Sequence, residues 1–200
     1  MKIIVVGATG LIGREIVNAL SGTHDIIEVG HKAGEYRVDI TSKSSIEELF
    51  KKTGQFDALV SAAGNAVFKS LAQLTDDDFM LGLKDKLMGQ VNLVRVGLKY
   101  VNNNGSFTLT SGVLASEPMP GSSAISLVNA GLNGFVKAAA LDMKNGIRVN
   151  IVSPPFATET LKALGMDTSI GIPVAKFVRA YKESVEVKRT GEVIDVRKFV

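Results

Sequence analysis

The stretch VVGATGLIGREIV, residues 5 to 17, joins an apolar run to a helix-like pattern through three spaced glycines, Gly7, Gly10 and Gly13. One glycine at such a junction lets the chain turn tightly, another lets the backbone approach a pyrophosphate, and a third lets the helix pack close to the strand. The first turn of the helix then offers free N–H groups and the positive end of its dipole to an anion. The stretch therefore predicts a strand, a phosphate-binding loop and a helix.

The rest of the chain repeats this alternation of strand and helix. Short runs rich in β-branched residues alternate with longer stretches of helical periodicity. Such an alternation implies parallel strands with right-handed crossovers, and hence an α/β doubly wound, Rossmann-like sheet covered on both faces. We expect about seven strands, at 3–7, 25–30, 36–40 (the weakest), 56–62, 106–111, 147–152 and 191–196, helices at 11–20, 43–52, 76–101, 123–144 and 173–185, and an irregular segment at 153–172 with room for one short helix.

Length and composition exclude several classes of protein. Two hundred residues, 46% of them hydrophobic, suit one domain spanning 1–200. The chain has no cysteine and two histidines, which excludes disulfides and argues against a metal site. The net charge of +3 is spread along the chain, which argues against nucleic acid as a partner. No stretch has the ~18 apolar residues that a membrane helix needs, and MKIIVV is too short for a signal peptide, so we expect a cytoplasmic protein.

The end of the second predicted strand indicates which dinucleotide would bind. An acidic residue there would bond the 2′-hydroxyl of the adenosine ribose, whereas a cation would accept a 2′-phosphate. His31 and Lys32 follow Gly30 at this point, which favours NADP over NAD. The alternative is a solvated basic loop, with Glu28 or Glu35 in the ribose role. Asp39, which ends the weakest strand, has a carboxylate that could bond the adenine amine.

Further motifs resemble the short-chain dehydrogenase/reductase family over nearly the whole chain. SAAG (61–64) is similar to the family's Asn-Asn-Ala-Gly element without its asparagines, RVNIVSPPF (148–156) to its strand followed by Pro-Gly, and TGEVIDV (190–196) to its closing strand. The resemblance implies a nicotinamide dinucleotide cofactor and oxidoreductase chemistry. The cofactor contacts that we expect are Gly7, Thr9, Gly10, Leu11, Ile12, Gly13, His31, Lys32, Asp39, Ile40, Ala62, Ala63, Gly64, Pro154 and Phe156.

The catalytic residues that the resemblance implies are replaced. The family uses a Ser, a Tyr and Lys spaced as Y-x-x-x-K on one helix, and an Asn on the preceding helix. Alignment on AGLNGFVKAAALDM (130–143) places Ile125 at the Tyr position, Asn129 at the Lys position, Gly112 at the Ser position and Lys86 at the Asn position. The usual proton relay, in which the ammonium lowers the pKa of the phenol, is therefore missing.

Three residues are candidates for replacement chemistry. Lys86 belongs at the edge of the apolar face of its helix, so it either extends along the core to solvent or points into the cleft. Ser111 precedes the lost Ser position and faces away from the cofactor unless the strand end turns. Asn129 can hydrogen-bond a ribose but carries no charge, and its alternative role is a polar core contact.

Two classes of function remain open. The first is an NADP-dependent oxidoreductase acting on a small carbonyl or alcohol, with Lys86, a hydroxyl or water supplying the proton. The second is a catalytically silent NADP-binding sensor or regulatory protein, which the missing general acid favours. In either case the apolar and small residues of 79–98 and 127–141 predict a homodimer or homotetramer formed through these helices.

Overall fold

One sheet organises the computed structural model, which describes residues 1–200. All pairings are parallel, and the strand order is β3-β2-β1-β4-β5-β6-β7. The order reverses between β1 and β4, the point at which open α/β sheets bind ligands beyond their carboxyl ends. The predicted doubly wound fold is confirmed, with strands β1 Lys2–Val6, β2 Asp25–Gly30, β3 Tyr36–Arg37, β4 Phe56–Ser61, β5 Val101–Thr110, β6 Arg148–Ser153 and β7 Val193–Asp195.

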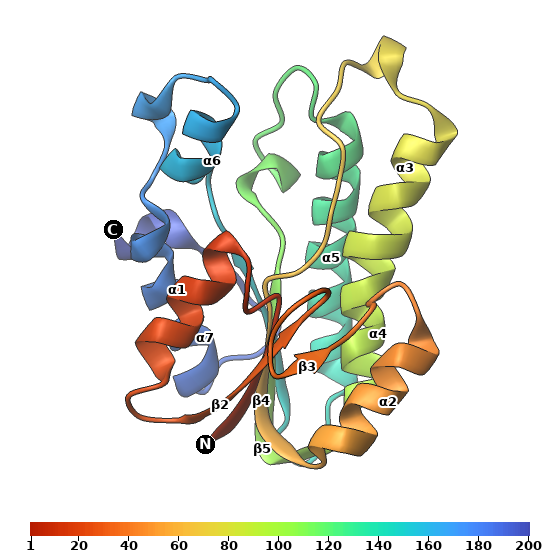
Figure 1. The fold of residues 1–200 in the computed structure, drawn as a ribbon, viewed down its shortest axis with the longest axis vertical. Coiled ribbons are helices and arrows are strands. Elements are labelled where there is room, and N and C mark those ends of the chain that lie inside the picture. The colour runs from red at the N-terminus through yellow and green to blue at the C-terminus, as the bar shows by residue number, and fades with distance from the viewer.

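Helices cover both faces of this sheet (Figure 1). Two of them, α1 and α7, pack on one face, whereas α2, α4 and α5 pack on the other. The helices are α1 Leu11–Leu20, α2 Lys43–Thr53, α3 Asp76–Gly82, α4 Met88–Gly97, α5 Ser123–Asp142, α6 Thr158–Ala163 and α7 Val178–Glu186. The predicted helix at 11–20 is therefore confirmed at both ends.

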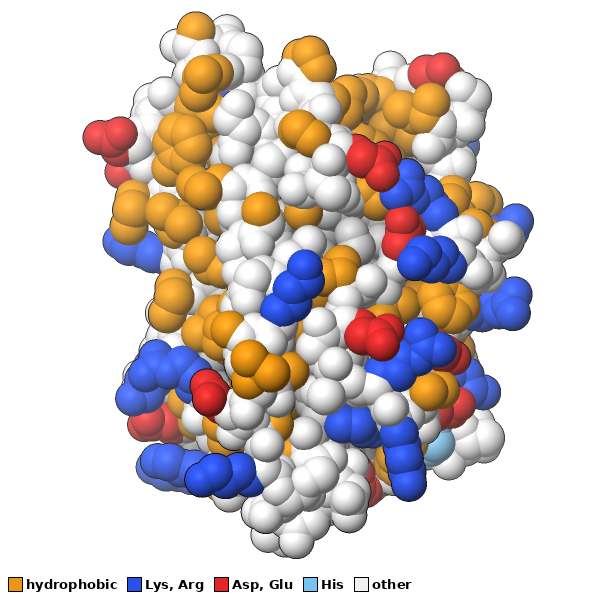
Figure 2. All heavy atoms as spheres, turned by 180° about the vertical axis from the view of Figure 1, so that it is seen from behind, with side chains coloured by type: hydrophobic (Ala, Val, Ile, Leu, Met, Phe, Trp, Pro, Cys, Tyr) orange, Lys and Arg blue, Asp and Glu red, His pale blue; other side chains and the backbone are white.

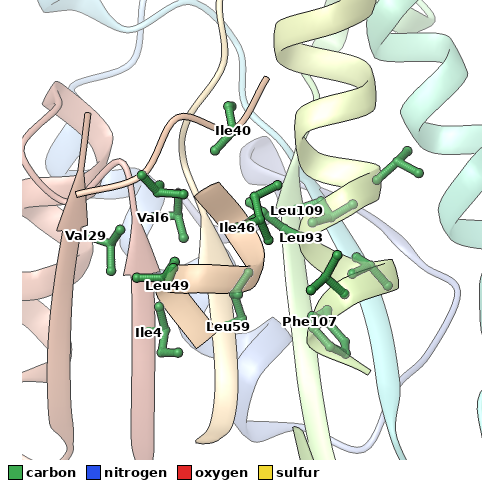
Figure 3. Packing of buried hydrophobic residues seen from close by; sticks show 14 of the residues in the cluster. Ile4, Val6, Val29, Ile40, Ile46, Leu49, Leu59, Leu93, Phe107 and Leu109 are labelled. Carbon is green, nitrogen blue, oxygen red and sulfur yellow. The ribbon is translucent and has the colours of Figure 1, made fainter. Parts of the chain in front are cut away.

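The two cores explain why the strands read as continuous apolar runs. Along β1, Ile3 and Val5 point to the face covered by α1 and α7, and Ile4 and Val6 point to the opposite face. All four side chains are buried because a central parallel strand has no solvent side. Figure 3 shows the second face, where Ile4, Val6 and Leu59 pack against side chains of the α2 and α4 layer.

The single helix predicted over 76–101 is wrong in its middle. A π-helical turn, Leu83–Leu87, separates α3 from α4, and α4 ends at Gly97. A π turn holds one residue more than an α turn, so the helical phase shifts between the two halves. Leu98, which a uniform helix would place on the apolar face with Leu87 and Val94, is 43% exposed for this reason and because it follows the helix end.

Both edge strands are shorter than predicted. β3 ends at Arg37 because the N–H of Asp39 turns to the Ser45 hydroxyl, 3.0 Å away, instead of continuing the ladder. β7 ends at Asp195, whose carboxylate accepts the N–H of Arg197 and caps a short 3-10 helix. β5, in contrast, begins five residues earlier than expected, at Val101.

Three long connections rise beyond the carboxyl ends of the strands (Figure 1). They follow β4, β5 and β6, and the last contains the predicted short helix as α6. The connection after β4 is also irregular, which the sequence analysis did not anticipate. Short 3-10 helices complete these and other segments, at Leu71–Gln73, Val113–Ala115, Thr168–Ile170, Val174–Phe177 and Val196–Phe199.

Helix α5 corrects the expectation that no segment is apolar enough for a membrane helix. By length and composition alone, Ser123–Asp142 passes that test with a mean hydropathy of 1.3. One such helix is weak evidence, because core helices of soluble proteins pass the same test. Val128, Leu132 and Val136 pack one face of α5 against the core, whereas 28% of its apolar window is buried in all.

Candidate cofactor groove and reaction cavity

The loop between β1 and α1 has the geometry of an anion cradle. Gly7 has a φ of +86°, and a Cβ on Gly13 would collide with the carbonyl oxygen of Gly7. Helix α1 has no side-chain cap at Gly10, so the N–H groups of its first turn remain free. Arg14 stiffens the loop by donating from Nε to the carbonyl oxygen of Thr9 at 2.8 Å. The loop can therefore take a pyrophosphate on its backbone N–H groups.

A groove of about 530 Å³ extends from this loop across the strand ends. Nine of the fifteen predicted cofactor residues line it: Gly7, Thr9, Gly10, His31, Asp39, Ile40, Ala62, Ala63 and Gly64. Six further residues that were not predicted also line it, Val6, Gly30, Val38, Thr41, Asn65 and Asp85, of which the first five adjoin predicted residues in the chain.

The other six predicted cofactor residues lie outside this groove. Leu11 is exposed at the start of α1, Ile12 packs against the core, and Gly13 is buried beneath Gly7. Lys32 is exposed on the turn after β2 and does not line the groove. Pro154 and Phe156 line the neighbouring cavity instead.

Asp39, the acidic residue that lines the groove at the predicted adenosine end, has a defined partner. Asp39 accepts the N–H and the hydroxyl of Thr41 at 2.9 and 2.7 Å, and these bonds, the hydroxyl first, lower the pKa of its carboxyl. Glu28 and Glu35, the alternatives for the ribose, do not line the groove. His31 is therefore the one basic side chain among the residues that line it.

The π turn brings two oppositely charged neighbours to different sites. Asp85 faces the groove, where its carboxylate accepts the backbone N–H and the side-chain amide of Asn65 at 3.1 and 2.9 Å. On a uniform α-helix Asp85 would lie opposite the apolar face, and the extra residue in the π turn directs it to the groove instead. Gly64, with a φ of +128°, lets the turn approach, since a Cβ there would lie 2.8 Å from Cγ of Lys86.

Lys86 points into a cavity of about 120 Å³ that adjoins the groove, as the cleft alternative predicted. Its Nζ donates to the carbonyl oxygen of Ser111 at 3.1 Å, and burial lowers the pKa of the amine to about 8. The cavity is lined by Lys86, Ser111, Gly112, Val113, Leu114, Ile125, Asn129, Pro154, Pro155 and Phe156. All three candidate catalytic residues therefore lie around one space.

Two polar side chains in this cavity lack hydrogen-bond partners. Ser111 and Asn129 are 3% and 1% exposed, and neither Oγ of Ser111 nor Oδ1 of Asn129 has a partner. Ser111 faces the cavity because β5 ends at Thr110 and the chain turns there. Gly112 leaves room for the amide, since a Cβ there would lie 3.0 Å from Nδ2 of Asn129. Buried polar atoms without partners are rare, so a bound ligand is the natural source of their hydrogen bonds.

Gln90 supports the cavity and was missed by the sequence analysis. Its amide pairs with both backbone groups of Thr110 at 2.9 Å and also donates to the carbonyl oxygen of Lys86 at 3.2 Å. It thereby fixes the end of β5 to the π turn. The signal was an amide four residues after Lys86, but its partner strand was not evident from spacing.

The fold and the groove define the class of protein. A parallel sheet with a glycine-rich loop at the point of strand reversal is the architecture of a Rossmann-like dinucleotide-binding protein. A family profile described as "Enoyl-(Acyl carrier protein) reductase" matches residues 15–200. The chain belongs to the short-chain dehydrogenase/reductase family of oxidoreductases, whose members bind nicotinamide dinucleotides.

Similar proteins agree with this assignment. The chain is 28% identical over 158 residues to 3-oxoacyl-[acyl-carrier-protein] reductase of Bos taurus, which covers 77% of this chain and 62% of the relative. It is 26% identical over 153 residues to hydroxynaphthalene reductase arp2 of Aspergillus fumigatus, covering 74% of this chain and 54% of the relative. The chain therefore spans less than two thirds of the length of either curated relative.

Solved structures match over almost the full chain. The protein lin1944 of Listeria innocua superposes with a TM-score of 0.94 at 36% identity, covering 98% of this chain and 99% of its own. A small-chain dehydrogenase in complex with NADPH superposes with a TM-score of 0.87 at 25% identity, covering 98% and 95%. The fold is thus found at this length in other proteins.

Proposed function

We propose that this protein is an NADP(H)-dependent oxidoreductase that acts on a small carbonyl compound or the corresponding alcohol. The observation that carries the proposal is the position of Lys86, whose ammonium enters a small cavity directly beside the dinucleotide groove. Hydride transfer belongs to the cofactor, so the protein has to orient two reactants and supply a proton. The groove and the cavity provide these two requirements.

The residues of the groove fit NADP. The loop around Gly7 admits the pyrophosphate, and for a 2′-phosphate His31 offers a hydrogen bond and Lys32, on the same turn, offers positive charge. The acidic groups that line the groove are engaged by Thr41 and Asn65. The structural relative that holds NADPH supports this choice. NADPH would supply a hydride to the carbonyl carbon of the substrate.

Lys86 is the proton donor in this proposal. As the carbonyl carbon gains the hydride, an N–H bond of the ammonium breaks and an O–H bond forms on the former carbonyl oxygen. The neutral amine then regains a proton from solvent. A pKa of about 8 suits this role, because the amine is mostly protonated at neutral pH yet gives up its proton more easily than an ordinary lysine. Ser111 and Asn129 would orient the ligand through their unpartnered oxygens.

Two parallel measurements test the proposal. NADPH consumption is followed at its absorbance with a panel of small aldehydes and ketones, and binding of NADPH and NADH is titrated at one ionic strength. We expect tighter binding of NADPH and turnover with at least one carbonyl, which Lys86→Met reduces. Tighter binding of NADH would reject the assignment of NADP(H) as the cofactor. Binding of the cofactor without turnover would favour the second candidate function, a sensor or regulatory protein. That candidate is supported by Ile125 and Gly112, which stand at the positions of the family's Tyr and Ser.

We also propose that the protein is a homodimer or homotetramer. Figure 2 shows hydrophobic side chains gathered along the left edge of the rear face, the side on which α3, α4 and α5 lie. Leu81 of α3, Met88 of α4, and Leu127 and Leu141 of α5 are 46%, 40%, 50% and 88% exposed. Light scattering should return a multiple of 21.2 kDa for the native chain and a smaller mass for Leu127→Glu. A monomeric native chain would contradict this assembly.

A further inference from the structure

The Lys86 ammonium lacks a counter-ion within the protein. No carboxylate lies within 4 Å of its Nζ, and its one hydrogen-bond acceptor is the neutral carbonyl oxygen of Ser111. The adjacent Asp85 is bonded to Asn65 on the groove side. Removing a charge from water without an opposite charge is costly, and this cost is recovered when an anion enters the site.

The remainder of the cavity is electrically neutral. Apart from Lys86, its walls are backbone, aliphatic and aromatic groups, the Ser111 hydroxyl and the Asn129 amide, and no other lining residue titrates. Its volume of about 120 Å³ corresponds to roughly four water molecules at their share of the liquid. A ligand that fills the space is therefore small, or presents a small reacting end.

The number of free N–H donors on Lys86 narrows the choice of ligand further. A lysine ammonium has three N–H groups, and one of them is used on Ser111. Two remain for acceptors that lie close together on one ligand. A 2-oxo carboxylate has its keto oxygen and a carboxylate oxygen on adjacent carbons, so both can accept from one ammonium. Ser111 and Asn129 also line the cavity, and the buried Oγ of Ser111 has no hydrogen-bond partner within the protein.

We propose that the cavity recognises a small 2-oxo carboxylate, or the matching 2-hydroxy carboxylate, by pairing its acid group and its neighbouring oxygen with Lys86. This inference rests on the proposed function, because the same ammonium then stands beside the oxygen that gains a proton. At neutral pH the amine is mostly charged, since burial lowers its pKa only to about 8. Recognition and protonation thus use one side chain.

Calorimetry on the NADP⁺-loaded protein tests the inference with three probes. Pyruvate is the 2-oxo carboxylate, butane-2,3-dione is a neutral compound of nearly the same shape, and acetate is a carboxylate without the keto group. We expect pyruvate to bind roughly 10-fold or more tightly than either of the others, as expected for an added charge-assisted hydrogen bond. Equal binding of pyruvate and butane-2,3-dione, or of pyruvate and acetate, would overturn the inference.

Matched lysine variants identify the group responsible. Lys86→Met should remove the preference for pyruvate over butane-2,3-dione, whereas Lys84→Met, on the exposed side of the same π turn, should retain it. Circular dichroism confirms that both variants fold. If Lys86→Met keeps the preference, the assignment is wrong. If pyruvate binds as expected but consumes no NADPH, recognition stands and the proposed oxidoreductase activity fails with this substrate.

Discussion

The cofactor groove and the reaction cavity adjoin at Asp85 and Lys86, yet they are built in different ways. The groove is largely backbone at strand ends, shaped by Gly7 and Gly64, and its carboxylates have partners. The cavity is built from side chains of separate segments, and the polar atoms of Ser111 and Asn129 are left without partners. A site formed by backbone groups can keep its ligand when many of the surrounding side chains are substituted. A site formed by side chains changes its chemistry when a few of them are replaced.

The largest expected effect is on the groove. Gly13→Ala places a Cβ against the carbonyl oxygen of Gly7, so the loop must move away from the pyrophosphate position. We expect NADPH affinity to fall by about 100-fold or more, which corresponds to losing two charge-assisted hydrogen bonds. Gly134→Ala on α5 is the control, because its Cβ would meet no atom within 4 Å. Calorimetric titration of both variants checks the prediction, and similar affinities would show that the loop is not a cradle.

In the cavity we expect a substitution to bring a gain, measured as the free energy of unfolding. Lys86→Met replaces a partly buried unpaired charge by an apolar chain of similar length, and we expect the free energy of unfolding at pH 7 to rise by about 1 to 3 kcal/mol. Because the pKa of Lys86 is lowered from 10.5 to about 8 in the folded state, the unfolded chain binds more protons between these values. The Lys86 contribution to native stability therefore becomes more favourable as the pH rises from about 8 to 10.5.

Urea unfolding at pH 7 and pH 10 measures this difference. The stabilising effect of Lys86→Met should be largest at pH 7 and smaller at pH 10. Lys84→Met should show neither the gain nor its pH dependence, since Lys84 is exposed. A lower free energy of unfolding for Lys86→Met would mean that the unpaired ammonium does not destabilise the native state.

A smaller effect is expected at the edge of the groove, on the preference for NADP over NAD. Lys32→Glu reverses a charge on the turn after β2, and we expect NADP to bind more weakly by about 1 to 2 kcal/mol while NAD changes little. Lys51→Glu, exposed on α2, is the control for a general change in charge. Dissociation constants for both cofactors at one ionic strength check the result. An equal loss for NAD would reject contact with a 2′-phosphate.

The smallest effect concerns the residue that separates the two sites. Asp85→Ala removes two hydrogen bonds between the half-buried Asp85 and the exposed Asn65. We expect the free energy of unfolding to fall by about 0.5 to 1 kcal/mol, against the gain expected for Lys86→Met. Urea unfolding of the two single variants compares the neighbours directly. If both variants had a higher free energy of unfolding than the native chain, the cause would be strain in the π turn and not the unpaired charge in the cavity.

Much of the groove was predictable because local patterns encode it. The glycines at 7, 10 and 13 predicted the loop, and SAAG predicted the wall that includes Gly64. Asp85 escaped prediction because a uniform helix of 100° per residue places it on the solvent side. Gln90 escaped because its hydrogen bonds cross to β5, twenty residues away.

The sequence by itself determined the alternation of strands and helices and the glycine-rich loop that follows the first strand. These features depend on the periodicity and backbone freedom of neighbouring residues. Only the tertiary structure decided that Lys86 enters the cavity, that Ser111 turns toward it and that Asp85 faces the groove. The reason is physical: these directions depend on an extra residue in one helical turn and on packing between segments that are distant in the chain.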